Sequence, residues 1–179
     1  MNQAGEAAPK VDLVIPSLRH EEAFLAAVAR SERLHDRFVE PPTTSALYRL
    51  NIARQRESRY ELRLVVDRES GELAGVVNAN EIVRGAAQSA FLGYYAFEPF
   101  AGTGRMEAGL RAMLREAFSR LGLHRLEANI QPDNTRSIAL VKRIGFRLEG
   151  LSLGYLEIRG QWRDHERWAL TREEFRARR

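Results

Sequence analysis

Residues 101–106 have the composition of a phosphate-binding loop. Gly102 and Gly104 stand one residue apart, directly before a run with the apolar spacing of a helix. Glycine lets a loop curl so that successive N–H groups point to one side, and it has no Cβ to keep a phosphate away. A helix N-terminus adds unpaired N–H groups and a favourable dipole, and Arg105 adds a formal charge. These residues predict a site for a phosphate or pyrophosphate group.

The loop differs from two familiar nucleotide-binding patterns. Its G-x-G is not followed by a third glycine three residues later, so it is not the dinucleotide fingerprint, and it has no G-K-[ST] of a nucleoside-triphosphate loop. The remaining alternative is a glycine-rich turn that only begins a helix. On the loop alone, both interpretations stay open.

The elements around the loop predict one domain in which helices are interleaved with a mixed sheet, hence an α/β or α+β fold. The apolar patterns predict strands and helices by their period. Strands are expected over 11–16, 59–67, 72–83, 90–97 and 124–130, with a final hairpin of 146–158 and 161–170. Helices are expected over 20–35, 44–52, 104–121 and 135–144. Residues 1–9 are expected to be disordered, and 172–179 to form a peripheral tail.

Length, charge and composition limit the function further. The 179 residues suffice for one domain with a buried core. The net charge of +4 favours an anionic partner such as a nucleotide cofactor. The arginines are scattered, so no DNA-binding tract is expected. The absence of cysteine excludes disulfides, thiolate metal sites and a cysteine nucleophile. No signal peptide or membrane-spanning run is present, so a cytoplasmic protein without a membrane partner is expected.

The second half of the chain resembles a known enzyme family. The segment "GYYAFEPFAGTGRMEAGL", the strand "GLHRLEA" and above all "PDNTRSIALVKRIGF" are similar to the GNAT acetyltransferase superfamily, in its RimJ/RimL branch of ribosomal-protein alanine N-acetyltransferases. The resemblance covers roughly residues 61–170. It implies a GNAT-like mixed, mostly antiparallel central sheet of about seven strands flanked by about four helices.

The resemblance also implies that acetyl-CoA is the co-substrate. The N–H groups of the glycine loop would hold its pyrophosphate, and the strand before the loop would pair with its pantetheine arm. Ala101 departs from the family, which commonly has arginine or glutamine there, because an alanine side chain cannot contact phosphate. The expected cofactor-binding residues are Tyr95, Ala96, Phe97, Ala101, Gly102, Thr103, Gly104, Arg105, Met106, Asn134 and Ser137.

Acetyl transfer to an amine needs a donor for the carbonyl oxygen and a proton for the leaving thiolate. The resemblance implies that a backbone N–H within 95–97 serves the oxygen and that Ser137 serves the thiolate. Asn134 lies one turn before Ser137 and would bind the cofactor arm. The alternative is that Asn134 only caps the helix and Ser137 stabilises its first turn.

The base that deprotonates the amine is expected to be Glu127, directly or through a water molecule. It alternates with the apolar residues of the strand 124–130, beside the expected cofactor cleft. The alternative is a surface glutamate paired with Arg125 or Arg136. Tyr155 and Glu157 on the late hairpin are further candidates.

The histidines and tryptophans carry no separate chemistry in this interpretation. His124 and His165 lack a second ligand at metal-binding spacing, so no metal is expected, and His165 is expected to be structural. Trp162 and Trp168 are expected in the core or the cleft wall.

The leading hypothesis is an acetyl-CoA-dependent N-acetyltransferase acting on a protein N-terminal amine, with a ribosomal protein as acceptor. A second hypothesis replaces this acceptor by a small amine, such as an antibiotic, polyamine or amino acid. A third is a non-catalytic CoA-binding or ribosome-associated module. The acceptor pocket is expected between residues 18–57 and the late hairpin, in a monomer or homodimer.

Overall fold

A computed structural model describes residues 10–178, and residues 1–9 and 179 lie outside the described part of the chain. The prediction of disorder for 1–9 therefore stays untested. The described part of the chain has seven strands: β1 (Val11–Val14), β2 (Glu61–Asp67), β3 (Leu73–Val83), β4 (Ser89–Ala96), β5 (Arg125–Ile130), β6 (Arg147–Ile158) and β7 (Gln161–Thr171). They form one sheet in the order β1-β2-β3-β4-β5-β7-β6.

Six α-helices occur within residues 10–178. They are α1 (Glu21–Arg30), α2 (Glu32–His35), α3 (Ser45–Ala53), α4 (Arg105–Phe118), α5 (Thr135–Ile144) and α6 (Arg172–Ala177). Two were not expected as separate helices. The predicted helix 20–35 is interrupted at Ser31, and the predicted peripheral tail is α6, which begins with a capping box of Thr171 and Glu174 and buries Phe175.

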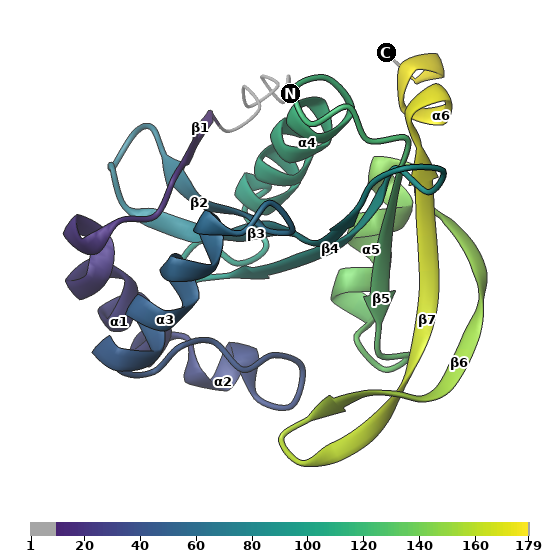
Figure 1. Ribbon diagram of the computed structural model, residues 1–179. Coiled ribbons are helices and arrows are strands. Elements are labelled where there is room, and N and C mark those ends of the chain that lie inside the picture. Colours follow the sequence, from purple (N-terminus) through teal and green to yellow (C-terminus); the bar gives the residue numbers. More distant parts are fainter. Residues whose placement is uncertain (1–9, 179) are drawn as a thin grey trace, which may run out of the picture.

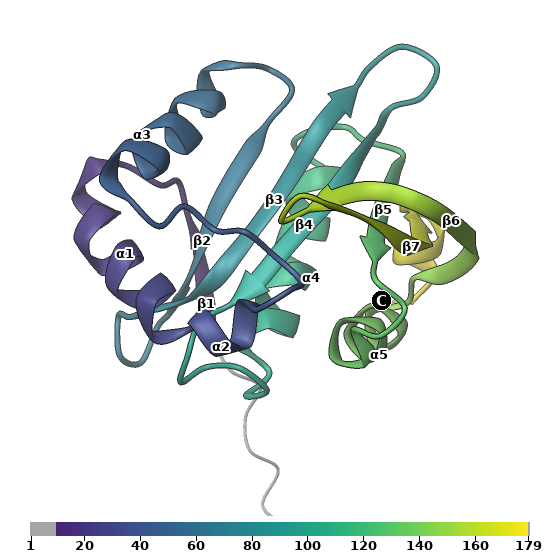
Figure 2. The same cartoon turned by 90° about the horizontal axis from the view of Figure 1, so that it is seen from below.

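The helices cover the two faces of the sheet with separate apolar clusters. Helices α1 and α3 pack over residues such as Leu64 and Val76, whereas α4 and α5 pack over residues such as Val65 and Val77 on the other face (Figure 1). Side chains alternate between the two faces of a strand, so adjacent residues such as Leu64 and Val65 lie on opposite faces of the sheet. The hairpin β6–β7 curves away from the other strands (Figure 2).

The sheet opens between its two middle strands. Among the strands of residues 10–178, β4 and β5 form the one parallel pair, and their pairing covers only Ser89–Phe91 against Arg125–Glu127. Both strands continue past this point, β4 to Ala96 and β5 to Ile130. Their later residues therefore carry backbone groups that no sheet neighbour occupies on that side, and α4 and α5 begin just after the two strands end.

Candidate functional site

The glycine loop has the geometry that its sequence predicts. Gly102 and Gly104 have φ angles of 77° and 82°, in the left-handed region that favours glycine. Thr103 closes the loop, because its hydroxyl donates to the Phe100 carbonyl at 2.6 Å. The first hydrogen bond of α4 runs from the Ala108 N–H to the Gly104 carbonyl. The Thr103 N–H donates to the Phe100 carbonyl at 3.3 Å, whereas the first N–H groups of α4 lie outside the helical ladder and are suited to bind an anion.

Arg105 has another partner than the one expected. Its Nε donates to Oδ1 of Asp67 at 2.7 Å, and Asp67 is buried at the end of β2. This hydrogen bond lowers the pKa of Asp67, which also accepts from the backbone and hydroxyl of Ser70. The guanidinium thus fastens the start of α4 to β2. The charge of Arg105 is therefore shared with a buried carboxylate, and a contact of Arg105 with the phosphate stays a prediction.

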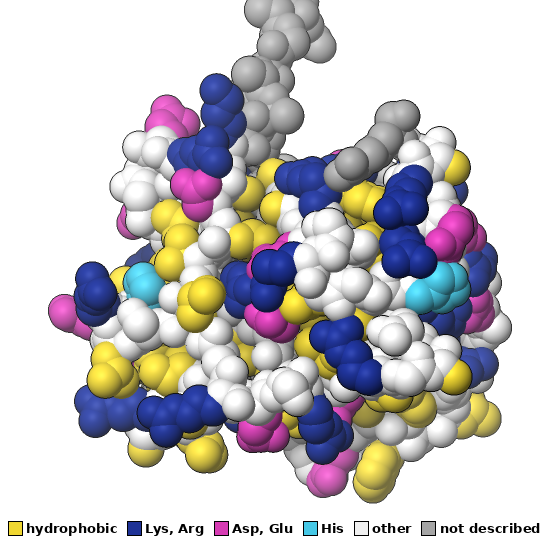
Figure 3. Space-filling model, turned by 45° about the horizontal axis from the view of Figure 1, so that its top comes forward, with side chains coloured by type: hydrophobic (Ala, Val, Ile, Leu, Met, Phe, Trp, Pro, Cys, Tyr) yellow, Lys and Arg dark blue, Asp and Glu magenta, His cyan; other side chains and the backbone are white. Residues whose placement is uncertain are grey.

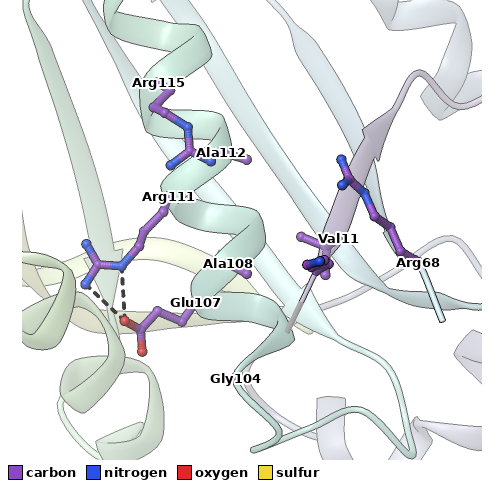
Figure 4. Close-up of a pocket in the computed structure, with 9 residues that line it drawn as sticks. Val11, Arg68, Gly104, Glu107, Ala108, Arg111, Ala112 and Arg115 are labelled. Carbon is purple, nitrogen blue, oxygen red and sulfur yellow. Dashed lines mark hydrogen bonds and ion pairs between the residues drawn. The ribbon is translucent and has the colours of Figure 1, made fainter. Parts of the chain in front are cut away.

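A basic pocket lies along the outer face of α4, beside β1. Its volume is about 490 Å³, and its cations are Lys10, Arg68, Arg111 and Arg115 (Figure 4). Arg111 pairs with Glu107 at 3.0 Å. On the face turned forward in Figure 3, cationic and anionic side chains are interspersed, in line with the scattered arginines of the sequence. Arg68 is likewise paired with Asp12 at 2.6 Å, so the charge of the pocket is partly neutralised and the pocket forms no continuous basic stripe.

The end of β4 offers one backbone N–H toward the opening. The Phe97 N–H donates to the Ala74 carbonyl at 2.9 Å, so it belongs to the ladder with β3. Hydrogen-bonding direction alternates along an antiparallel strand, so the N–H and C=O of Ala96 point away from β3. The Ala96 carbonyl is indeed bonded to Nε2 of His35 at 2.8 Å. Of residues 95–97, Ala96 is therefore the one whose N–H faces the opening.

Ser137 and Asn134 lie at the start of α5, on the α4 side of the opening. Asn134 caps the helix, accepting from the Ser137 N–H at 3.2 Å. The Ser137 hydroxyl lies 2.5 Å from the hydroxyl of Tyr94 on β4. Tyr94 was missed by the sequence analysis, although the alternation of "GYYAF" places Tyr94 and Tyr95 on opposite faces. Burial raises the pKa of the Tyr94 phenol, so this group stays protonated.

Glu127 forms an ion pair with Arg125, which is the structural alternative to a catalytic role for this glutamate. The Arg125 Nε donates to Glu127 at 2.8 Å, and Arg125 also binds Glu149. Together with Arg147, it lowers the pKa of Glu149 to about 2. The Glu127 side chain retains 24% of its exposure, on the face of the sheet opposite α4. Its role as a base or water relay stays a prediction.

The face opposite α4 carries polar groups that the fold itself does not use. Within residues 10–178, four buried side-chain atoms have no hydrogen-bond partner, namely His35 Nδ1, Asn78 Oδ1, Asn129 Oδ1 and Arg163 Nε. Asn78 pairs in register with Gly93 of β4, and Asn129 follows Glu127 on β5. The two asparagines therefore flank the opening on this face. Buried polar groups ordinarily have partners, so these atoms mark a place where a polar ligand would be bound.

A second pocket lies farther along this side of the molecule. It has a volume of about 600 Å³ and is lined by residues 40–43, by one side of α3 and by Arg159 at the tip of the hairpin β6–β7. These are the segments expected to form the acceptor pocket. His35 lies shortly before residues 40–43 in the chain. Burial lowers its pKa, so the imidazole is neutral, and its Nε2 is hydrogen-bonded to the Ala96 carbonyl.

The histidines and tryptophans named in the sequence analysis do not contribute to the opening between β4 and β5. His165 is buried, with Nδ1 2.9 Å from the Arg163 carbonyl, and His124 pairs with Glu173 at the surface. Trp168 is buried as expected, but Trp162 is 67% exposed and does not belong to the core.

The remaining candidates for the base lie on the hairpin. Tyr155 lies beside the ring of His165, and Glu157 is exposed. Within residues 10–178, no cluster of His, Asp or Glu could hold a metal ion, and no helix is long and apolar enough to cross a membrane.

Comparisons with known proteins agree with this geometry. Residues 12–147 match the family model described as an acetyltransferase (GNAT) domain. The chain is 34% identical over 132 residues to the probable N-acetyltransferase YjcK of Bacillus subtilis, covering 69% of this chain and 73% of that protein. It is 41% identical over 105 residues to the [ribosomal protein uS5]-alanine N-acetyltransferase of Escherichia coli, covering 59% of this chain and 54% of that enzyme. The match thus spans about half the length of the E. coli enzyme.

A solved structure extends the likeness to nearly the whole chain. Mycobacterium smegmatis RimJ in complex with CoA-disulfide superposes with a TM-score of 0.85 and 30% identity, covering 93% of this chain and 84% of that one. The groups in the present structure fit such a cofactor, since the start of α4 has N–H groups outside the helical ladder and the end of β4 is not paired with β5. The chain belongs to the GNAT acetyltransferase family and resembles its RimJ/RimL ribosomal-protein N-acetyltransferases, of which solved structures contain coenzyme A.

Proposed function

We propose that this chain acetylates the α-amine of a protein N-terminus, with a ribosomal protein as the acceptor. The observation that carries the proposal is the opening between β4 and β5. It has the anion-binding start of α4 on one face and unused polar side chains on the other. The similarity to the E. coli enzyme named for ribosomal protein uS5 supports the same acceptor class.

The acetyl-CoA pyrophosphate would be held by N–H groups of the glycine loop, and the thioester would lie at the end of β4. There the Ala96 N–H would donate to the carbonyl oxygen as it gains negative charge. The Ser137 hydroxyl would donate to the leaving sulfur. Glu127, or a water molecule that it holds, would take the proton of the amine.

The acceptor would approach from the face that carries Asn78 and Asn129. An ammonium or amine donates hydrogen bonds, which an asparagine side chain accepts through its amide oxygen. Rotation of the amide about its last bond exchanges the positions of this oxygen and the amide nitrogen. The acceptor chain would then extend toward the pocket formed by residues 40–43, α3 and Arg159.

The test is acetyl-CoA turnover on three acceptors at equal concentration: a peptide with a free N-terminal alanine, the same peptide with a blocked N-terminus and one lysine, and a polyamine. An α-amine has a pKa of about 8, against about 10.4 for lysine, so it is the better nucleophile at neutral pH. Turnover of the first peptide alone is expected. A preference for the lysine peptide or the polyamine would refute the acceptor assignment, and CoA binding without turnover would favour a non-catalytic module.

A further inference from the structure

The hydroxyl pair of Tyr94 and Ser137 joins the two sides of the opening. Tyr94 belongs to β4 and Ser137 to the first turn of α5, which follows β5. Their oxygens are 2.5 Å apart, although the residues are 43 positions apart in the chain. Tyr94 lies three positions beyond the last paired residue of β4, so this contact spans the region where the two strands have separated.

Each member of the pair is held independently of the other. The backbone of Ser137 is fixed by the Asn134 cap, which uses the Ser137 N–H and leaves its hydroxyl free. The Tyr94 ring packs against the apolar cluster under α4. The contact is therefore a consequence of two rigid elements and not of a flexible surface side chain.

The direction of this hydrogen bond follows from the chemistry of the two groups. A hydroxyl has one proton to donate and two lone pairs to accept. The phenol stays protonated, and when it donates to Ser137, the serine proton remains available for a third atom. The opposite direction would consume the serine proton on the phenol. Chains of hydrogen bonds that run in one direction strengthen each other, so an electron-rich acceptor beyond Ser137 favours the first arrangement.

We infer that Tyr94 is a positioning residue for Ser137: it donates its phenolic proton in a hydrogen bond to Ser137 Oγ and so directs the serine proton toward the sulfur of CoA. In the transfer, a bond forms between the amine nitrogen and the acetyl carbon, and the carbon–sulfur bond breaks with its electron pair on sulfur. The nitrogen loses one proton to Glu127 or the water molecule that it holds, and the sulfur gains one from Ser137. Glu127 releases its proton to solvent, and solvent returns one to Ser137. Tyr94 keeps its own proton throughout, which agrees with its burial. The inference rests on the proposed role of Ser137 in this reaction.

The test compares Tyr94→Phe with the wild type and with Ser137→Ala. Tyr94→Phe removes one oxygen and leaves the ring that packs under α4. Its kcat is expected to fall about 10- to 100-fold, while KM for acetyl-CoA and Kd for CoA change less than about two-fold. The double variant is expected to be no slower than Ser137→Ala, because residues acting as one unit have non-additive effects.

A matched control is Tyr48→Phe. Tyr48 is a buried tyrosine, and its hydroxyl donates to the Ser17 carbonyl at 2.9 Å, away from the opening. Tyr48→Phe should lower the melting temperature as much as Tyr94→Phe does, but it should leave kcat unchanged. Multiplicative losses in the double variant, or a Tyr94→Phe kcat equal to that of Tyr48→Phe, would overturn the inference.

A second measurement does not depend on the acceptor. The thiolate of bound CoA absorbs in the ultraviolet, so its pKa can be titrated in the binary complex. A hydrogen bond to the thiolate lowers this pKa, and Tyr94→Phe should raise it by about one unit relative to the wild type. An unchanged thiol pKa would contradict the inference. If the thiol pKa shifts as expected but no peptide acceptor is acetylated, only the proposed acceptor is refuted.

Discussion

Replacing Gly104 by aspartate tests whether the glycine loop holds the pyrophosphate. The matched control is Gly104→Asn, which has nearly the same shape and no charge. Both variants must adopt φ near 82°, which costs a side chain about 1 kcal/mol and is tolerated best by Asn and Asp. The two should therefore fold alike, and a carboxylate at the start of α4 is, if anything, favourable for the helix.

The difference between the two variants in CoA binding should be large. Unit charges about 4 Å apart repel by about 1 kcal/mol in water and about 4 kcal/mol near a protein surface. Arg105 cannot screen the new carboxylate, because it is held by Asp67 at 2.7 Å. An intermediate repulsion of about 2 kcal/mol corresponds to a Kd about 30-fold weaker for Gly104→Asp than for Gly104→Asn.

The assay is titration calorimetry with CoA, alongside thermal unfolding of each variant. Gly122→Asp serves as a second control for backbone strain, since Gly122 also has a positive φ, of 64°, and open space around it. Equal CoA affinity of the folded Gly104→Asp and Gly104→Asn variants would refute the assignment of this loop to the pyrophosphate. A loss of affinity shared by Gly122→Asp would trace the effect to folding.

Three further predictions concern the chemistry and the charges of the site. Ser137→Ala should lower kcat about 100-fold with little change in CoA affinity, and a lower melting temperature with normal turnover would leave it a helix residue only. Glu127→Gln should lower turnover most at low pH and least above the pKa of the amine, and a pH–rate profile parallel to the wild type would remove Glu127 from the mechanism. The pKa of Glu149 is depressed to about 2 from 4.5, so its stabilising effect is present above pH 4.5 and is lost as the pH falls toward 2. Urea unfolding of Glu149→Gln should therefore differ from the wild type at pH 5 and converge with it near pH 2, and a constant difference would contradict the shift.

Most elements of the fold follow from local sequence signals. The Asn134 cap, the left-handed Gly145 and the hairpin turn at 159–160 lie where their residue types predict them. The break at Ser31 has no such signal, because its hydroxyl accepts from the distant Glu98 N–H. Helix α6 did have one, the T-x-x-E pattern of Thr171 and Glu174, which the sequence analysis did not use.

The site was predicted less completely than the fold. The loop glycines could be recognised because positive φ and close approach demand glycine. The partners of the charged and hydroxyl groups could not, because they come from elsewhere in the chain. Asp67 reaches Arg105 across 38 positions, and Tyr94 reaches Ser137 across 43. Such pairs depend on strand register and helix packing, and neither can be predicted from the amino-acid composition or the period of apolar residues.

The separation of β4 and β5 has a consequence for the order of events in catalysis. A gap in the middle of a sheet can be reached from both faces, so the nucleotide and the amine would occupy it at the same time without sharing an entrance. The acetyl group would then pass directly from one to the other in a ternary complex, and the protein would never carry it. The 179 residues contain no cysteine to carry it on sulfur. Initial-rate plots at several fixed concentrations of acetyl-CoA should accordingly intersect and not run parallel.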